Sequence, residues 1–425
     1  VYKRQMMKAR SYDRRILTRD IKPNVYSIKE SNFLADSWQK ISDDEKFREI
    51  FQTVVDTFID AKEYGSILNV PDADYNYALS VIDDFEQSVP VDFEAQILRG
   101  KTDDIRALVN QAKLMAKKYT AVVTNPPYMN KFDAKLKKYI ADNFAEYKGD
   151  LFSVFMYHNF SFCTPDGYSA FMTPLVWMFI KTYEPLRNYI LSFKHLSTLI
   201  QFEYSAFEEA TVPICTFVLR NDNDINKSLC FRLSDFKGGM EVQKQKVLEA
   251  LADKSCGYYY EADQRNFAKI PKKRLGYWIS DKMIDQFSKK SVSDYADARR
   301  GLQTGNSERF IRKWYEVSTT KAALQIDDKT TQQTAKWFLF NSGGVFRRWY
   351  GNIIDVVNWE NSGREIKSTG KAIVPSEERY FDELVSWNKI SSGQMSVRYQ
   401  PNGIIPGDAS PFLHSLAQDH EIILY

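Results

Sequence analysis

Residues 119–128 read Tyr119-Thr120-Ala121-Val122-Val123-Thr124, followed directly by Asn125-Pro126-Pro127-Tyr128. The first six residues form a short, β-branched and apolar run, which is typical of a central strand buried on both faces of a parallel sheet. The two prolines fix φ and end the strand. Because open α/β sheets bind ligands at the carboxyl ends of their strands, this stretch predicts a functional turn at the edge of such a sheet.

Strands and helices alternate around this stretch. Short apolar runs predict strands at residues 24–28, 168–172, 196–202 and 212–219, and helical spacing predicts helices within 33–118 and at 150–163, 182–193 and 241–254. Alternation of this kind is typical of a doubly wound α/β sheet. We therefore expect a partial catalytic α/β domain over residues 1–224, with a helical insertion at about 33–118.

The last third of the chain differs in character. From Ser291 onward it is rich in Gly, Trp, Tyr and Arg and has only short apolar segments. This change predicts a domain boundary near 285–295. We expect a connecting region at 225–290 and an α+β domain, itself incomplete, at 291–425.

Composition excludes several classes of protein. Of the 425 residues 44% are hydrophobic and 27% are charged, which fits an ordinary soluble protein. No apolar run approaches the roughly 20 residues that cross a bilayer, so we expect no membrane partner. The four cysteines and four histidines lack metal-ligand spacing, so we expect no metal, and buried thiols in a reducing cytoplasm. A net charge of +3 is too small to indicate a partner.

The turn at 125–128 suits chemistry on an exocyclic amine. Adenine N6 is a weak nucleophile because its lone pair is delocalised into the ring, and two acceptors aimed at its hydrogens would localise that lone pair. The Asn125 side-chain oxygen and the Pro126 carbonyl can supply these acceptors, Pro127 stiffens the turn, and Tyr128 offers a ring for stacking. A base inside a duplex must be flipped out to reach such a site. The alternative is a tight surface turn without chemistry.

Four segments carry a pattern known from other enzymes: Thr124–Tyr128, Asp150–Phe155, Gly167–Pro174 and Ser205–Pro213. They resemble motifs IV, V, VI and VIII of the amino-methyltransferases that modify adenine in DNA. The resemblance implies a Rossmann-like methyltransferase sheet and S-adenosylmethionine as cofactor, with Asn125 and Phe152 beside it. It also implies that Tyr128 and Phe207 stack on the flipped adenine. A place in the hydrophobic core is the alternative for Phe207.

Three more segments narrow the resemblance: Met6–Asp13, Asn341–Asn352 and Trp387–Gly393. Together they resemble the BREX phage-defence methyltransferases of the PglX type. This implies methylation of adenine N6 in duplex DNA, with double-stranded DNA and other proteins of the defence system as partners. The family chain is much longer on both sides. Val1–Gln5 resembles the translated end of a sequencing adapter, so we expect the natural sequence to begin near Met6 and to be preceded by more.

One departure from the family concerns the cofactor. Its motif I, a glycine-rich loop that receives the methionine part of the cofactor, is absent, since no D/N-P-x-x-G-x-G pattern occurs. We expect it upstream, so the sheet is expected to be N-terminally truncated and this chain to bind the cofactor poorly. If residues 24–28 are the third strand of the sheet, Glu30 or Ser31 lies where the cofactor adenine is read. A solvated loop carboxylate is the alternative.

The C-terminal third resembles a target-recognition domain. Gly301–Asn306, followed by Arg309, resembles the entry of such domains, where a glycine-rich turn approaches a phosphate that Asn306 and Arg309 can contact. Basic residues also form three local groups: Arg299-Arg300, Arg312-Lys313 with Trp314-Tyr315, and Arg347-Arg348 with Trp349-Tyr350. Such groups favour a basic groove that binds DNA, although each alone is more often a surface ion-pair partner.

Two alternative functions stay open. The chain could be the methylase part of a combined restriction-modification enzyme, whose nuclease would lie outside it. It could also be a DNA-binding defence subunit without catalysis, against which the intact Asn125–Tyr128 motif argues. Other enzymes with this motif act on protein glutamine or RNA, and the aromatic, Arg-rich C-terminal region favours DNA.

Overall fold

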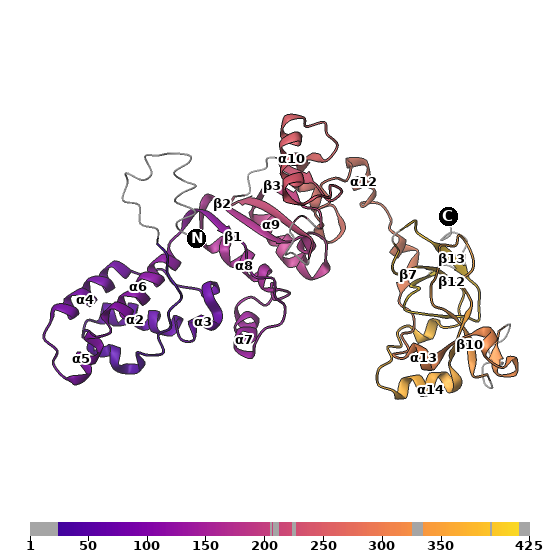
Figure 1. The fold of residues 1–425 in the computed structure, drawn as a ribbon, viewed down its shortest axis with the longest axis horizontal. Helices are drawn as coiled ribbons and strands as arrows, with labels where there is room; N and C mark the ends of the chain where they lie inside the picture. Colours follow the sequence, from indigo (N-terminus) through magenta and orange to yellow (C-terminus); the bar gives the residue numbers. More distant parts are fainter. Residues whose placement is uncertain are drawn as a thin grey trace. The chain divides into compact units, whose positions relative to one another are not determined.

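The structure is a computed structural model that describes residues 24–204, 206, 212–222, 227–324, 335–391 and 393–415. The chain divides into two compact units, Val1–Gln286 and Phe287–Tyr425 (Figure 1). The predicted stacking residue Phe207 and the segment Met6–Asp13 lie outside the described residues.

The N-terminal unit begins with helices α2 (Glu45–Thr57), α3 (Ala61–Tyr64), α4 (Tyr75–Gln87), α5 (Phe93–Arg99) and α6 (Thr102–Ala116). An aspartate before α2, α4 and α5 accepts a backbone N–H from the first turn, which is the usual N-cap of a helix: Asp44, Asp74 and Asp92. Apolar side chains at helical spacing, such as Phe47, Phe51 and Ile82, form a buried core between the helices. The helical periodicity predicted for this part of the chain is confirmed.

A six-stranded mixed sheet follows, in the order β1-β2-β4-β3-β5-β6. The strands are β1 (Tyr119–Thr124), β2 (Cys163–Pro174), β3 (His195–Gln201), β4 (Ile214–Arg220), β5 (Lys227–Arg232) and β6 (Tyr259–Asp263). Strands β1, β2, β3 and β5 run in one direction, whereas β4 and β6 run in the other.

Helices separate these strands along the chain: α7 (Ala134–Asn143), α8 (Leu151–Asn159), α9 (Glu184–Phe193), α10 (Gly239–Ala252), α11 (Gln264–Phe267) and α12 (Asp281–Gln286). Successive strand residues point to opposite faces of a sheet. Leu199 packs in the cluster that contains Ile190 of α9, while its neighbour Ile200 packs against the cluster that contains Ala250 of α10. Helices therefore cover both faces of this part of the sheet.

Three expectations about this unit are wrong. Residues 24–28 form no strand, and Val25 is 79% exposed. Strand β1 has the predicted bounds, but it lies at the edge of the described sheet, where Val123 is 79% exposed. Residues 225–290 are not a connecting region, because β5 and β6 extend the sheet. An apolar, β-branched run reports β propensity and not the place of a strand within its sheet.

The C-terminal unit contains two sheets, in the orders β14-β10-β11-β8, with β9 paired to β10, and β13-β12-β15-β7. Their strands are β7 (Ala296–Arg299), β8 (Ile311–Lys313), β9 (Ala322–Ala323), β10 (Trp337–Asn341), β11 (Asp355–Asn358), β12 (Leu384–Trp387), β13 (Val397–Gln400), β14 (Ile405–Pro406) and β15 (Phe412–Ser415). Helices α13 (Ser307–Phe310) and α14 (Glu360–Ser368) complete the unit. Its core includes Leu302, Phe310 and Phe338.

Neither unit offers a membrane span or a metal cluster within its described residues. No described helix combines the length and the apolar character that a bilayer crossing requires. No group of three or more His, Cys, Asp or Glu side chains in that part of the chain is arranged to hold a metal ion. The four cysteines are free thiols, of which Cys256 is only half-buried.

Candidate active site

Three parallel strands of the N-terminal unit end at the same edge of its sheet. Strand β1 leads into 125–128, β2 ends at Pro174, and β3 leads into the segment 202–213. The Leu175 N–H donates to the Pro213 carbonyl at 3.0 Å, which joins two of these connections. Ligands of open α/β sheets bind at this edge. The topology therefore brings the ends of the predicted motifs IV, VI and VIII to one edge.

The Asn125 side chain is positioned by Tyr128 of the same turn. The Tyr128 hydroxyl lies 3.1 Å from Asn125 Oδ1 and 3.1 Å from the backbone carbonyl of Met172. A tyrosine phenol is protonated at neutral pH, and burial first, and then the nearby Cys215, raise the pKa of Tyr128 further, so its single O–H is a donor that these two acceptors share. An amide oxygen has two lone pairs. Asn125 Oδ1 can therefore accept this bond and a second one from a substrate N–H.

The Asp150 carboxylate binds the backbone next to the turn 125–128. Asp150 Oδ1 accepts the backbone N–H of Met129 at 3.0 Å and that of Phe152 at 3.3 Å. The Leu151 N–H also donates to the Met129 carbonyl at 2.8 Å. Asp150 is the N-cap of α8, and burial raises its pKa even though these hydrogen bonds act to lower it. Asp150 begins the segment that resembles motif V, but its bond to the turn was not predicted; an aspartate before an apolar helix is a usual cap signal.

Aromatic rings support Tyr128. The ring of Phe152, predicted to lie beside the cofactor, is 6.4 Å from that of Tyr128, at an angle of 88°. Phe152 is only 1% exposed, and its ring lies 5.2 Å from that of Tyr183. Burial, with a contribution from Asp150, raises the pKa of Tyr183 to about 12. Because Tyr128 itself is 39% exposed, it offers an accessible ring on a rigid apolar support.

The two residues predicted to read the cofactor adenine have partners in the helical part of the unit. Ser31 is buried, and its hydroxyl donates to the Val55 carbonyl at 2.6 Å. Glu30 Oε2 lies 3.2 Å from Lys62 Nζ, and Glu30 Oε1 accepts the Lys62 backbone N–H at 3.3 Å. Both sets of contacts tie the segment to α2 and α3, and none of the contacts described for either residue is with 125–128.

Three of the residues predicted to contact DNA are engaged within the C-terminal unit. Asn306 Oδ1 caps α13 by accepting the Arg309 backbone N–H at 3.0 Å. Arg309 Nη2 lies 2.5 Å from Glu365 Oε1. The Arg312 guanidinium donates to two backbone carbonyls of its own unit. These contacts support α13 and β8. If one of these side chains contacts DNA, it must first break its bond within the unit.

Arg347 and Arg348 differ from these three. Both side chains are exposed, and no carboxylate of the described residues forms an ion pair with either. Of the five predicted contacts, these two are therefore the cations that the described part of the chain leaves available for an external anion.

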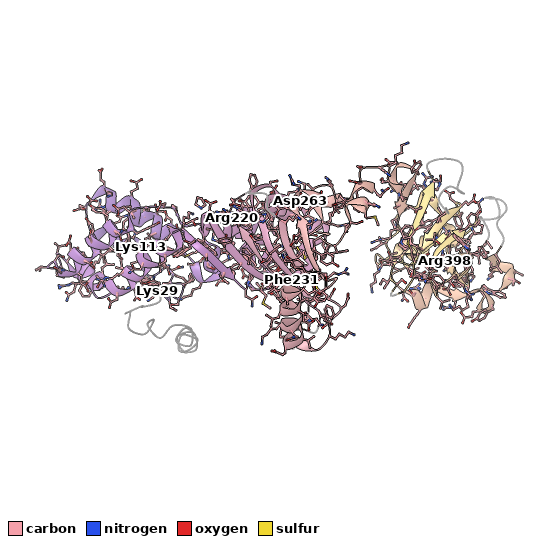
Figure 2. The ribbon with its side chains drawn as sticks, turned by 90° about the horizontal axis from the view of Figure 1, so that it is seen from above. Lys29, Lys113, Arg220, Phe231, Asp263 and Arg398 are labelled. Carbon is pink, nitrogen blue, oxygen red and sulfur yellow. The ribbon has the colours of Figure 1, made fainter. Side chains whose placement is uncertain are left out.

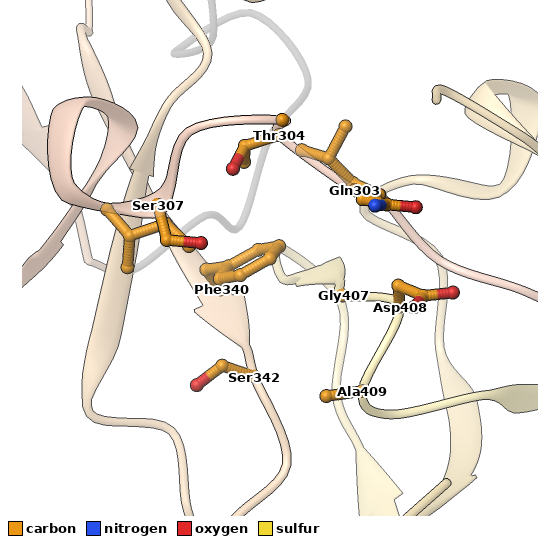
Figure 3. A pocket seen from close by; sticks show the side chains of 11 residues that line it. Gln303, Thr304, Ser307, Phe340, Ser342, Gly407, Asp408 and Ala409 are labelled. Carbon is orange, nitrogen blue, oxygen red and sulfur yellow. The ribbon is translucent and has the colours of Figure 1, made fainter. Parts of the chain in front are cut away.

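A cavity of about 470 Å³ lies beside the predicted phosphate-contacting turn (Figure 3). Its lining includes Gln303, Thr304, Ser307, Phe340, Ser342 and Asp408. A Cβ at Gly301 would lie 2.2 Å from the Pro406 carbonyl oxygen, and one at Gly305, whose φ is +73°, would lie 2.7 Å from the Lys371 carbonyl oxygen. Close packing within the unit already accounts for both glycines.

Solved structures share the fold only weakly. The type IIL restriction-modification enzyme MmeI, solved in complex with DNA, aligns over 70% of this chain and 41% of its own, with 12% identity and a TM-score of 0.46. A nuclease-deletion mutant of the type ISP enzyme LlaGI, in complex with a DNA substrate mimic, aligns over 80% and 40%, with 10% identity and a TM-score of 0.44. Similarity at this level says nothing about the activity of this chain.

Sequence relatives are far more informative. The family model of the Eco57I restriction-modification methylase matches residues 14–207. The adenine-specific methyltransferase PglX of Lacticaseibacillus casei (strain Zhang) is 30% identical over 446 aligned positions, which cover 100% of this chain and 36% of PglX. The adenine-specific methyltransferase BrxX of Escherichia coli O9:H4 (strain HS) is 30% identical over 94% of this chain and 34% of BrxX. The chain thus spans about one third of these relatives, and it is similar to PglX over its whole length and to BrxX over nearly all of it.

Proposed function

We propose that this chain supplies the adenine-binding half of a DNA methyltransferase that acts in phage defence. The reaction transfers a methyl group from S-adenosylmethionine to adenine N6 in duplex DNA, with the base flipped out. The observation that carries the proposal is the Asn125–Tyr128 turn at the carboxyl edge of the sheet, where the Tyr128 hydroxyl is held against Asn125 Oδ1. The names of the homologues PglX and BrxX support the base and the reaction.

The turn acts by accepting hydrogen bonds from the amine. Asn125 Oδ1 accepts a hydrogen bond from one N6–H, and the Pro126 carbonyl accepts one from the other N6–H. These two bonds draw the N6 lone pair out of conjugation with the ring. Tyr128 holds Asn125 in place through its hydroxyl and stacks its ring on the base. Asp150 fixes the turn through the Met129 N–H. Catalysis of this kind depends on positioning and electrostatics rather than on a strong general base.

The cofactor supplies the electrophilic methyl group, and the described residues fit only the edge of its site. Phe152 is 1% exposed and packs behind Tyr128, while Ser31 and Glu30 are engaged with Val55 and Lys62. We therefore expect this chain alone to bind S-adenosylmethionine weakly. Isothermal titration should give no saturable heat at micromolar cofactor, and a micromolar Kd would contradict the expectation.

The direct test is methyl transfer by the natural protein that contains this chain. Asn125→Ala removes one acceptor from N6, so transfer of labelled methyl to duplex DNA should fall by at least about 100-fold, as for the loss of one preorganised polar group in other active sites. Asn143→Ala is the matched control, because Asn143 is exposed and its side chain bonds, among the described residues, to the Tyr139 carbonyl in the preceding turn of α7. Equal activity of Asn125→Ala and the control would overturn the proposal.

The match to the Eco57I restriction-modification methylase favours a second candidate. In that case the chain is the methylase part of a protein that also cleaves DNA. Incubation of the natural protein with unmethylated DNA distinguishes the two candidates, because only a combined enzyme produces double-strand breaks. A non-catalytic binding subunit is distinguished by Asn125→Ala, which would then leave phage protection unchanged.

A further inference from the structure

A loop between β10 and β11 of the C-terminal unit gathers exposed apolar side chains. Residues 344–350 read Gly-Val-Phe-Arg-Arg-Trp-Tyr, and all seven are exposed. The exposed fractions are 67% for Val345, 47% for Phe346, 58% for Trp349 and 59% for Tyr350. Single exposed apolar residues are common, but several of them together usually mark a binding surface.

Hydrogen bonds from side chains of the segment 388–396 anchor the backbone of this loop. Asn388 Nδ2 donates to the Gly344 carbonyl at 2.7 Å. Ser396 Oγ accepts the Arg347 backbone N–H at 3.2 Å and donates to the Arg347 carbonyl at 2.7 Å. Two side chains from the segment 388–396 therefore fix the backbone of the loop at separate points.

One buried arginine orients both anchors. Arg398 of β13, labelled in Figure 2, is 1% exposed, and burial lowers its pKa. Its guanidinium donates to Ser396 Oγ at 2.6 Å and to Asn388 Oδ1 at 2.8 Å. Burying a cation without a carboxylate partner is unfavourable unless its hydrogen bonds are satisfied. Arg398 directs two of its bonds to the residues that hold the loop and a third to Ser410 Oγ at 3.5 Å, while its Nε has no partner among the described residues.

The backbone at Trp349 is strained and is held on both sides. Trp349 has a φ of +71°, which a bulky residue rarely adopts. Its N–H donates to the Val397 carbonyl at 3.0 Å, and its carbonyl accepts the Tyr399 N–H at 2.7 Å. Strain of this kind persists where the surroundings enforce it, and it gathers at functional sites. The loop is therefore preorganised with its apolar side chains exposed.

We propose that residues 344–350 form a preformed DNA-binding loop, in which Arg347 and Arg348 contact phosphates while Phe346 and Trp349 pack against bases. The inference deepens the proposed function and rests on it. Beyond the phosphate contacts of the two arginines, the apolar side chains contact the bases, and Arg398 keeps the loop rigid.

The combination of groups favours DNA over a protein partner. Aromatic residues and arginine are enriched at protein interfaces as well, but two adjacent guanidinium groups that no carboxylate of the described residues pairs favour a partner whose negative charge repeats along its length. Duplex DNA offers both kinds of complement, because phosphates bind arginine and base steps accept apolar side chains. Lys367 of the same unit, by contrast, pairs with Glu377 at 2.6 Å.

The salt dependence of binding tests the arginines. Binding of the full chain to a short fluorescent duplex is measured over a salt series for wild type and for the double variant Arg347→Ala/Arg348→Ala. Loss of two phosphate contacts should reduce the slope of log K against log salt by roughly 2. Lys367→Ala is the matched control, since its ammonium group is already paired with Glu377, and it should leave the slope unchanged.

Variants of the apolar side chains test the base contacts. Trp349→Asn removes the ring and keeps a residue type that tolerates positive φ, and Phe346→Ala removes the second ring. Each should weaken binding roughly tenfold or more at a fixed salt concentration while the salt slope is retained. Asn388→Ala, which removes one anchor, should weaken binding without changing the slope, because only preorganisation is lost. Melting curves of each variant show that the chain is folded.

The outcomes separate the two proposals. Wild-type binding with loop variants that behave like Lys367→Ala would overturn the loop proposal and leave the catalytic one intact. Loop variants that bind DNA normally but lose self-association would make the loop a protein-docking surface, which also overturns it. Failure of wild type to bind any duplex would overturn the loop proposal, whereas loss of methyl transfer in Asn125→Ala would still support the catalytic one.

Discussion

At the scale of single residues, Asn125 and Tyr128 are the groups proposed to face the substrate, and the Asp150 carboxylate holds the turn that carries them. Asn125 and Tyr128 could be proposed from the sequence because a proline-bounded turn of this kind after a short apolar run is rare. Asp150 could not, because its importance depends on Met129 lying within hydrogen-bonding distance across 21 positions of the chain. Arg398 was missed for the same reason, since a lone arginine in a strand gives no sign that it is buried.

The Tyr128 hydroxyl gives the first prediction. Tyr128→Phe keeps the ring but removes the donor to Asn125 Oδ1, so the amide becomes free to rotate. Loss of one preorganising hydrogen bond should lower kcat about tenfold with little change in KM for DNA. Steady-state methyl transfer by the natural protein checks this. A variant with unchanged kcat and raised KM would show that the hydroxyl acts in binding instead.

The Asp150 carboxylate gives the second prediction. Asp150→Ala removes the cap of α8 and the bond to the Met129 N–H, so unfolding free energy should fall by about 1 kcal/mol and activity should fall as well. Asp133→Ala removes the cap of α7 and serves as the control for stability. Urea unfolding and methyl transfer are measured for both. Asp150→Asn, which keeps an acceptor oxygen, should restore most activity, and equal activity loss in Asp133→Ala would contradict a positioning role.

At the scale of elements, residue spacing predicted the bounds of several helices and strands well, but it predicted the place of the strands within their sheet poorly. Strand β1 was expected at 119–124 and is found there, and the helix expected at 241–254 is α10, Gly239–Ala252. Both follow from local composition. The edge position of β1 and the membership of β5 and β6 in the same sheet depend on pairing between distant segments, which no local pattern encodes.

Helix α8 gives a prediction about pH. His158 is buried between the rings of Phe144 and Phe162, and burial lowers its pKa from 6.5 to about 4. Because the folded state resists protonation, its contribution to stability is complete above pH 6.5 and is lost as pH falls toward 4. Between pH 7 and 5 the loss should be about 2 kcal/mol.

Urea unfolding of wild type and His158→Phe at both pH values isolates this effect from the titration of other groups. The variant keeps an aromatic ring and has no proton to gain. Its loss of stability between pH 7 and 5 should therefore be smaller than that of wild type by about 2 kcal/mol. Parallel losses in the two proteins would place the acid sensitivity elsewhere.

At the scale of the whole molecule, the chain joins two kinds of surface in separate units. The N-terminal unit carries the turn proposed to bind adenine on a six-stranded sheet, and the C-terminal unit carries an exposed loop of arginine and aromatic residues. The similarity to PglX and BrxX covers both units. The two proposals together assign the positioning of the reacting base to one unit and the contacts with the surrounding DNA to the other.

The measurement that tests the central claim most directly is a long-read methylome of cells that express the natural protein containing this chain. Wild type should place N6-methyladenine within one DNA sequence motif, and Asn125→Ala should leave that motif unmodified. Absence of N6-methyladenine with wild type, or an equal methylation pattern in both, would contradict the account.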